Sequence, residues 1–346
     1  MTIASKPPVT MKDVATAAGV HYSTVSRALN PATPYLVKPQ IAARILQTAR
    51  ELGYRTNSLA SSLRTKRSRV VGVVVPDIAS LLFPPILEGI EHALLKEGYM
   101  TIVGNSANDP ERHRRVLTGM MERQVDGLIL ASTTLNDPIP DEWFENRAPI
   151  VLMNRTDESG RAPAVVNDDM RGIGLAVRHL VDLGHKRIIH VAGPNFLSTG
   201  AVRQRAFKLA CSELSVPLNR HSIVEATSFT REAGKIACIE ALAKNPQTTA
   251  IVAANDLIAL GCYDALAEKK LSCPEDISIT GYNDSPFVDL VRPPLTSVRV
   301  DQREMGLEAA RILLARMGGH HAGADILLRP EFVLRQSTTP PRTPSH

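Results

Sequence analysis

Hydrophobic and polar residues follow two different patterns on either side of residue 70. Before it, apolar residues recur at helical spacing in short stretches, which predicts three helices, at 10–18, 22–29 and 39–52. Gly19 and Gly53 are placed to end the first and third helices, because glycine readily adopts the positive φ of a helix C-terminus. The stretch 57–65 has few apolar residues to bury, so we expect disorder there unless a partner stabilises it.

After residue 70, continuous apolar runs alternate with helical stretches. The runs predict strands at 70–76, 100–105, 126–132, 148–154, 186–193, 222–226, 249–255, 277–284 and 326–337. The stretches between them predict helices at 84–97, 110–123, 168–183, 199–213, 230–243, 256–269 and 302–317. Such alternation is typical of parallel sheets with both faces covered. The elements are too many for one sheet, so we predict an α/β fold of two lobes with a cleft between them, followed by a disordered tail at 338–346.

Positive charge is concentrated near the N-terminus. Residues 1–70 contain eleven Lys and Arg residues and two acidic ones, a formal charge of +9. The whole 346-residue chain carries +5, so residues 71–346 carry −4. A small basic module on a mildly acidic body is typical of a nucleic-acid-binding protein, and a basic solvated tail is the alternative on charge alone.

Several classes of protein are excluded by features that the sequence lacks. No apolar run approaches the roughly 20 residues needed to span a bilayer, and residues 1–14 have no apolar core of signal-peptide length. We therefore expect a cytoplasmic protein with no membrane partner, in which four widely separated cysteines are buried rather than paired or bound to metal: Cys211, Cys238, Cys262 and Cys273. No HExxH, GxSxG or P-loop motif is present, and no GxGxxG opens a helix after a strand. We expect no catalytic residues, no metal site and no cofactor.

The segment VTMKDVATAAGVHYSTVSRALN, residues 9–30, joins the first two predicted helices through a tight glycine turn, as a helix-turn-helix unit does. It closely resembles the DNA-binding head of the LacI/GalR family of repressors. Related strings continue along nearly the whole chain, among them ARELGY (49–54), NSLASSLRTKRSRVVGVVVPDI (57–78), VDGLIL (125–130), LGHKRI (183–188) and GYND (281–284) followed by PPLTSVR (293–299).

The resemblance implies a homodimeric transcriptional repressor that binds a palindromic operator in double-stranded DNA and responds to a small-molecule effector. It implies a helix-turn-helix headpiece at 9–56, a hinge helix and linker at 57–69, and an effector-binding core at 70–337 similar to periplasmic sugar-binding proteins. Within that core it assigns 70–166 and 297–325 to the first lobe, and 167–296 and 326–337 to the second. The C-terminal tail has no heptads, so we expect a dimer rather than a tetramer. The sequence leaves open whether the effector releases the protein from DNA or promotes binding, and whether the outcome is repression or activation.

The second headpiece helix corresponds to the recognition helix that the family places in the major groove. Alignment with the family puts Tyr22, Ser23 and Arg27 at base edges, where arginine can bond bidentately to guanine. The alternative is that Tyr22 packs on the headpiece and Arg27 contacts only phosphate. Three further residues are predicted to contact phosphate: Thr24, Ser26 and Asn30.

In the family, paired hinge helices enter the minor groove and a leucine from each wedges a base step open. Alignment places Leu63 at that position. Asn57 would begin the hinge helix, Ala60 would allow close backbone approach, and Arg64 would reach the groove. The alternative is that Leu63 is an ordinary apolar linker residue, but nothing nearby in the sequence could bury it.

The cleft between the lobes is the predicted effector site. Family alignment places eleven residues around it: Leu82, Phe83, Asn105, Ser132, Arg155, Thr199, Arg203, Phe229, Asn255, Asp256 and Asn283. Arg203 is the strongest candidate among them. It lies one turn into the helix that follows the segment AGP (192–194), at the position that binds the ligand in relatives. Its alternative role is a structural salt bridge.

Asn283 departs from the aspartate that often stands at its position in sugar- and purine-binding relatives, which removes an acceptor charge. With Arg155 and Arg203 also present, we expect a ligand with a carboxylate, such as a sugar acid, and a neutral sugar is the alternative. A second departure is His21, which stands where the family most often has a serine that caps the recognition helix. A third is the segment NPATPYLV, which is longer and richer in proline than usual.

Two other kinds of binding protein fit parts of the sequence. A solute-binding protein of a transporter would have the same core, but the absent export signal and the basic head argue against it. A nucleoid architectural protein would not need the large α/β core. The sequence therefore favours an effector-controlled transcription regulator.

Overall fold

The computed structural model describes residues 9–29, 36–54, 67–136, 143, 149–320 and 325–342. The chain divides into two compact units, Met1–Ser68 and Arg69–His346. Both fold-level predictions are confirmed, because the first unit is helical and the second contains two α/β lobes built on largely parallel sheets. Of the hinge helix and linker predicted at 57–69, residues 57–66 lie outside the described residues.

The first unit is a bundle of α1 (Met11–Ala17), α2 (Tyr22–Ala28) and α3 (Pro39–Glu51). A capping box starts α1, since Thr10 and Asp13 bond each other's backbone N–H groups. The backbone bond from Thr10 lowers the pKa of Asp13. Gly19 and Gly53 have φ values of 62° and 68°, as expected for residues that end helices. The core of this headpiece comes from all three helices: Val14, Ala15, Ala18, Val25, Ile45 and Ala49.

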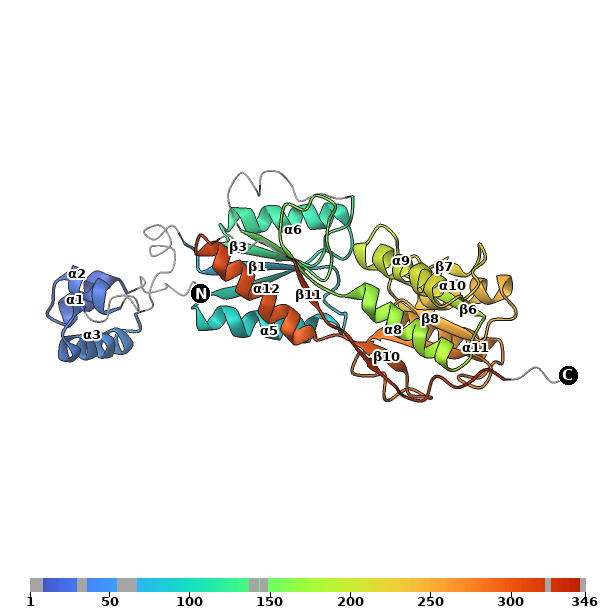
Figure 1. Ribbon diagram of the computed structural model, residues 1–346. Coiled ribbons are helices and arrows are strands. Elements are labelled where there is room, and N and C mark those ends of the chain that lie inside the picture. Colours follow the sequence, from blue (N-terminus) through green and yellow to red (C-terminus); the bar gives the residue numbers. More distant parts are fainter. Residues whose placement is uncertain are drawn as a thin grey trace, which may run out of the picture. The chain divides into compact units, whose positions relative to one another are not determined.

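The N-lobe contains a six-stranded sheet in the order β11-β5-β4-β3-β1-β2, with every neighbouring pair parallel. Its strands are β1 (Val70–Val75), β2 (Met100–Asn105), β3 (Gly127–Leu130), β4 (Ile150–Met153), β5 (Ala164–Asn167) and β11 (Ile326–Leu328). Helices α5 (Phe83–Lys96) and α12 (Gln302–Met317) cover one face, and α6 (Pro110–Glu122) covers the other (Figure 1). The continuous apolar strands are therefore buried on both sides.

The C-lobe contains a second six-stranded sheet, in the order β12-β10-β9-β8-β6-β7. Its strands are β6 (Ile188–Ala192), β7 (Ile223–Glu225), β8 (Ala250–Ala253), β9 (Ser278–Asn283), β10 (Thr296–Arg299) and β12 (Glu331–Val333). Only the pairing of β12 with β10 is antiparallel. Helices α8 (Asp169–Asp182) and α9 (Ser198–Glu213) cover one face, and α10 (Arg231–Lys244) and α11 (Asp256–Glu268) cover the other.

The chain passes between the lobes three times: from β5 to α8, from β10 to α12, and from β11 to β12. The lobe boundaries drawn from the sequence are wrong at the last two passages. Strand β10 belongs to the C-lobe, although the sequence boundary put residues 297–299 in the first lobe. Strand β11 belongs to the N-lobe, because the predicted single strand at 326–337 is broken at Arg329-Pro330, where proline cannot continue the ladder.

The sequence missed β5 and β10, which are only four residues long each. It also wrongly assigned residues 338–342 to a disordered tail. Thr338 and Thr339 bond His179, His185 and Ser278 of the C-lobe, and Arg342 forms an ion pair with Asp276. These bonds between chain-distant residues order a segment whose local composition favours disorder. Residues 343–346 lie outside the described part of the chain.

Within the described ranges, no helix is both long and apolar enough to cross a membrane. The four cysteines are unpaired. The prediction that they are buried is confirmed for Cys211, Cys238 and Cys262 and is wrong for Cys273, which is half-buried.

Glycines allow α5 and α12 to approach closely. A Cβ atom at Gly306 would collide with the carbonyl oxygen of Ile86, and one at Gly89 would collide with the carbonyl oxygen of Arg303. Both obstacles are backbone atoms, which cannot rotate away. The two helices cover the same face of the sheet, so this contact supports the N-lobe core.

We predict that Gly306→Ala lowers the free energy of unfolding of the N-lobe by about 1–3 kcal/mol, because the added methyl group forces the helices apart. The matched control is Gly119→Ala in α6, where a Cβ would meet only the end of the Arg123 side chain. This control should be neutral or stabilise the lobe by up to about 1 kcal/mol. Urea unfolding followed by fluorescence of Trp143, the single tryptophan, reports on this lobe directly. Equal stabilities of the two variants would contradict the close packing.

Candidate functional site

The recognition helix α2 begins with an unusual cap. His21 has extended backbone angles, and its Nδ1 accepts a hydrogen bond from the backbone N–H of Ser23 at 3.3 Å. The same nitrogen lies 2.8 Å from the Ser23 hydroxyl. Histidine therefore performs the capping role that serine, threonine or aspartate usually performs.

One face of α2 is open to solvent. Tyr22 is 49% exposed and Arg27 is exposed, whereas Val25 is fully buried against the other helices. Ser23 and Ser26 fall on the same helix face as Tyr22 and Arg27, since residues spaced by four lie side by side. Thr24 is half-buried. The exposure of Tyr22 disfavours the alternative in which its ring packs within the headpiece.

Five predicted DNA-binding residues lie outside the described residues: Asn30, Asn57, Ala60, Leu63 and Arg64. Their roles stay predictions.

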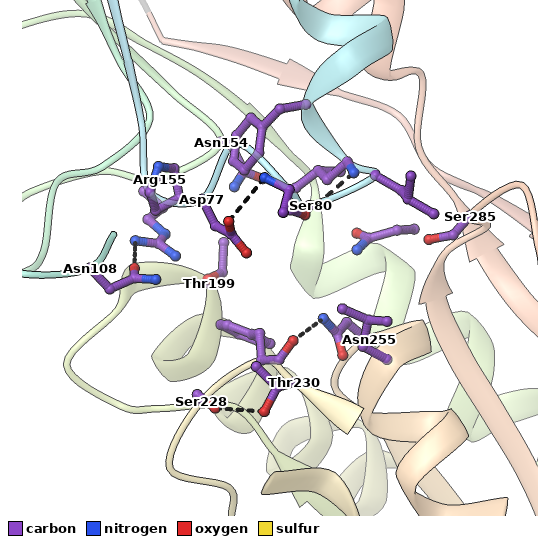
Figure 2. Close-up of a pocket in the computed structure, with 18 of the residues that line it drawn as sticks. Asp77, Ser80, Asn108, Asn154, Arg155, Thr199, Ser228, Thr230, Asn255 and Ser285 are labelled. Carbon is purple, nitrogen blue, oxygen red and sulfur yellow. Dashed lines mark hydrogen bonds between the residues drawn. The ribbon is translucent and has the colours of Figure 1, made fainter. Parts of the chain in front are cut away.

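The second unit contains a cavity of about 360 Å³ between its lobes. Its wall is formed by residues that follow the carboxyl ends of parallel strands in both sheets: Pro76, Asp77 and Ala79–Phe83 after β1, Asn108 after β2, Asn154 and Arg155 after β4, Thr199 and Arg203 after β6, Ser228–Thr230 after β7, Asn255 and Leu257 after β8, and Asn283, Ser285 and Phe287 at and after the end of β9. Open α/β sheets bind ligands at these ends. Figure 2 shows Asp77, Asn154 and Arg155 on one side of the pocket, with Thr199, Thr230 and Asn255 on the other.

The structure brings eight of the eleven residues predicted for the effector site to this pocket: Leu82, Phe83, Arg155, Thr199, Arg203, Phe229, Asn255 and Asn283. It does not bring Asn105, Ser132 or Asp256 to the wall. The amide oxygen of Asn105 accepts from the Ala107 N–H, and the Ser132 hydroxyl lies 3.1 Å from Nε2 of His113, beside α6. Both side chains are thus used within the N-lobe.

Asp256 is fully buried behind the pocket instead of lining it. Its carboxylate accepts hydrogen bonds from the backbone N–H of Ser285 at 2.7 Å and from the Ser297 hydroxyl at 2.6 Å. Burial raises its pKa to about 6, although both bonds oppose that shift. Asp256 therefore positions the segment that carries Ser285, which does line the pocket.

Sequence reasoning missed most polar residues of the wall, including Asp77, Ser80, Asn108, Asn154, Ser228, Thr230 and Ser285. Their common signal is position, because each follows the end of a strand. Two of the missed residues, Asn108 and Asn154, share a structural feature, since they have positive φ values of 53° and 64°. Asparagine tolerates positive φ better than most residues, and backbone strain of this kind concentrates at functional sites.

Arg203 is held by three groups of the C-lobe. Its Nε lies 3.1 Å from Oδ1 of Asp169, Nη1 donates to the carbonyl oxygen of Ala254 at 2.8 Å, and the guanidinium stacks 3.8 Å from the ring centre of Tyr282. Both charged side chains of the ion pair are buried. Arg203 thus lines the pocket and also forms the structural salt bridge that was the alternative to ligand binding.

Arg155 has a different environment. It is only 6% exposed, and Nη1 donates a long hydrogen bond of 3.3 Å to Oδ1 of Asn108. Its Nε has no hydrogen-bond partner among the described residues. Burial, together with the positive charge of Arg203, lowers the pKa of Arg155 to about 10. A cation in the N-lobe therefore faces the pocket without a neutralising carboxylate.

Several hydrogen bonds connect the lobes beside the pocket, and one of them runs from the Gln302 side-chain amide of α12 to the carbonyl oxygen of Asn283 at 3.3 Å. The Leu135 N–H donates to the carbonyl oxygen of Phe196 at 3.0 Å, and the Thr156 N–H donates to the Ser198 hydroxyl at 2.9 Å. Thr156 and Ser198 are direct neighbours of the lining residues Arg155 and Thr199. A change in lobe separation would therefore alter the pocket wall.

Both compact units match known family models. Residues 10–57 match the model of bacterial regulatory proteins of the lacI family, and residues 177–338 match the periplasmic binding protein-like domain. The chain is 32% identical to catabolite control protein A of Priestia megaterium over 332 residues, which cover 95% of this chain and 99% of that protein.

Solved structures of transcriptional regulators also resemble this chain over nearly its whole length. The lac repressor dimer bound to operator and the anti-inducer ONPF has a TM-score of 0.83 and 26% identity, covering 96% of this chain and 99% of that one. The complex of the transcriptional regulator CelR with cellobiose has a TM-score of 0.74 and 28% identity, covering 95% and 99% respectively.

The two pocket arginines should respond oppositely to replacement by methionine. Arg203→Met leaves Asp169 buried without a partner and should lower the free energy of unfolding by about 3–5 kcal/mol. Arg155→Met removes a buried cation that has no counter-ion, so its effect should stay within about 1 kcal/mol or be stabilising. Urea unfolding of the ligand-free variants, followed by circular dichroism, measures both. If Arg155→Met cost as much as Arg203→Met, Arg155 would have a structural role that this geometry lacks.

Proposed function

The chain belongs to the lacI family of bacterial regulatory proteins, and on that premise we propose that it is a cytoplasmic transcriptional repressor whose operator affinity is controlled by a small molecule. One observation carries the proposal. A small basic unit exposes Tyr22 and Arg27 on its recognition helix, and the same chain continues into a unit with a polar pocket between two lobes.

The headpiece supplies the DNA contacts in this proposal. Tyr22, Ser23 and Arg27 read base edges in the major groove, where a bidentate arginine–guanine pair discriminates by about 1–3 kcal/mol. Thr24, Ser26 and Asn30 contact phosphate groups and fix the register on the duplex. The hinge adds a minor-groove wedge by Leu63, with Asn57, Ala60 and Arg64 around it.

The interlobe pocket receives the effector. The eight predicted residues on its wall, Arg155 and Arg203 among them, are the proposed contacts, and Asp256 acts through Ser285. A sugar or sugar acid suits the volume of about 360 Å³, which is near the lower end of the usual range for small-molecule pockets.

Linkage between the two sites requires only that the effector prefer one separation of the lobes. An effector that favours one separation shifts the population of lobe arrangements and thereby changes the geometry offered to DNA. The same pocket serves induction or corepression, depending on which arrangement the effector prefers.

The edge of the N-lobe sheet supports a homodimer. Strand β2 ends the sheet, and Met100 is 65% exposed, with Ile102, Val103 and nearby Leu95 also exposed. An apolar edge strand is normally covered, because it otherwise promotes aggregation. We infer that a second copy of the chain covers it, which also brings two headpieces to one palindrome.

A solute-binding protein is the rival of another class, since the periplasmic binding protein-like model matches the C-terminal half. That function would leave the basic headpiece without a role. No enzymatic function is proposed, because the regulators to which this chain is similar carry names of control proteins and repressors.

Selection from a random pool of double-stranded DNA, at fixed near-physiological salt, tests the DNA-binding function. We predict an enriched palindrome of two half-sites. Arg27→Ala should abolish the preference at one position in each half-site, because a bidentate base contact is lost. Arg50→Ala on α3 is the control, which changes an exposed charge of the same unit and should leave the preferred sequence unchanged. Absence of any enriched motif, with pooled metabolites present as well as absent, would contradict the function.

The dimer has its own test in analytical ultracentrifugation. Met100→Glu places a charge on the exposed edge strand and should weaken dimerisation at least about tenfold, with a parallel loss of affinity for the palindrome. Leu209→Glu makes the same change on α9, where Leu209 is 47% exposed, and should leave both unchanged. If Met100→Glu dimerised as tightly as wild type, the dimer interface would have to lie on another surface.

A further inference from the structure

Arg155 is the buried charge that the fold itself does not explain. Two arginines are buried among the described residues, Arg155 and Arg203, and only Arg203 has a carboxylate partner. Burying a cation without a counter-ion is costly, so such groups are normally paired in the working state of a protein. The missing partner of Arg155 is expected to come from outside the chain.

Part of the Arg155 guanidinium has no hydrogen-bond partner among the described residues. Nη1 is occupied by Asn108, which leaves the edge formed by Nε and Nη2. Nε has no acceptor among the described residues, and the side chain lines the pocket, reaching toward the Thr199 side in Figure 2. Two parallel N–H donors on one edge of a guanidinium match the two oxygens of a carboxylate.

The rest of the wall offers few negative charges. Among the described residues that line it, Asp77 is the only acidic one, and its Oδ1 already accepts a hydrogen bond from the Ala79 N–H at 3.0 Å. Apart from Arg155 and Arg203, the other polar side chains are neutral amides and hydroxyls: Ser80, Asn108, Asn154, Thr199, Ser228, Thr230, Asn255, Asn283 and Ser285. Such groups bond the hydroxyls of a polyhydroxylated molecule without repelling an anion.

We propose that the effector is a small polyhydroxylated carboxylic acid whose carboxylate is bound by Arg155, an assignment that rests on the effector-controlled function above. The carboxylate replaces the counter-ion that Arg155 lacks, while the amides and hydroxyls bond the rest of the molecule. A phosphate ester fits less well, because a dianion calls for further cations and the guanidinium of Arg203 is already neutralised by Asp169.

The same contact gives the effector a means of acting on the lobes. Arg155 follows β4 of the N-lobe, whereas Thr199, Thr230 and Asn255 line the pocket from the C-lobe. A molecule whose carboxylate binds Arg155 and whose hydroxyls bond these groups contacts both lobes. A bound acid therefore favours approach of the lobes, whereas a neutral sugar lacks the ionic contact with the N-lobe.

Matched pairs of ligands test the proposal on the full-length protein. The probes are D-glucose with D-glucuronate, D-galactose with D-galacturonate, glucose 6-phosphate, and formate as the smallest carboxylate, all compared with sodium chloride at equal ionic strength. Thermal shift identifies binding at ligand concentrations up to about 100 mM, since a ligand stabilises the native state by RT ln(1 + [L]/Kd). Calorimetry then gives the affinities of the probes that bind.

We expect at least one carboxylate to bind wild type about 10- to 100-fold more tightly than its neutral partner, which is the range for a charge-assisted contact. Arg155→Met should remove this advantage, so that the acid and its neutral partner bind the variant with similar affinities. Arg155→Lys should restore part of it, because it returns the charge without the planar fork. Arg178→Met, an exposed change on α8, should bind as wild type does.

Three results would overturn the inference. The first is that an acid and its neutral sugar bind equally tightly, and the second is that only the phosphate ester binds. The third is that no carboxylate, formate included, stabilises the protein in a way that depends on Arg155. Each leaves the proposed function intact if DNA selection still yields a palindrome, so the two failures are distinguishable.

Discussion

The arrangement of strand ends is the constraint on which the rest of the second unit depends. Both sheets direct the carboxyl ends of their parallel strands toward the same pocket, and three passages of the chain join the lobes beside it. Every lining residue therefore stands at or after a strand end, whatever its distance along the chain. The pocket wall consists of two halves, so a ligand that contacts both halves acts on the separation of the lobes. The pocket thus lies beside the three chain passages that connect the lobes.

The two arginines of the pocket wall are neutralised to different extents in the two lobes. The C-lobe neutralises Arg203 with Asp169 and fixes its plane against Tyr282. The N-lobe presents Arg155 with one amide contact and no carboxylate. The first arginine is therefore part of the fold, and the second is the one that we propose binds the effector. This division explains how a pocket built from a widely shared framework becomes selective, since Asn154 and Asn283 add no negative charge that would repel an acid.

The sequence predicted most of the architecture because its signals are local. Apolar runs, glycine stops and the headpiece motif depend on nearby residues, and the helices and most strands lie where these signals placed them. The errors come from long-range pairing. Strand β10 joins the C-lobe through contacts with β9 and β12, and residues 338–342 are ordered by histidines more than 150 residues earlier in the chain. Alignment placed Arg155 and Arg203 at the pocket, but only the geometry separates their roles. It likewise shows that Asp256 supports Ser285 from behind the wall.

The most direct test of the account is reciprocity between the pocket and the DNA. Operator affinity would be measured with and without a carboxylate that stabilises the protein through Arg155, and the affinity for that carboxylate with and without operator. The account predicts that each changes the affinity for the other by the same factor, about 5- to 150-fold, in wild type and not in Arg155→Met. An operator affinity that is unchanged at saturating carboxylate would show that the pocket binds a ligand without controlling DNA binding, and would contradict the central claim.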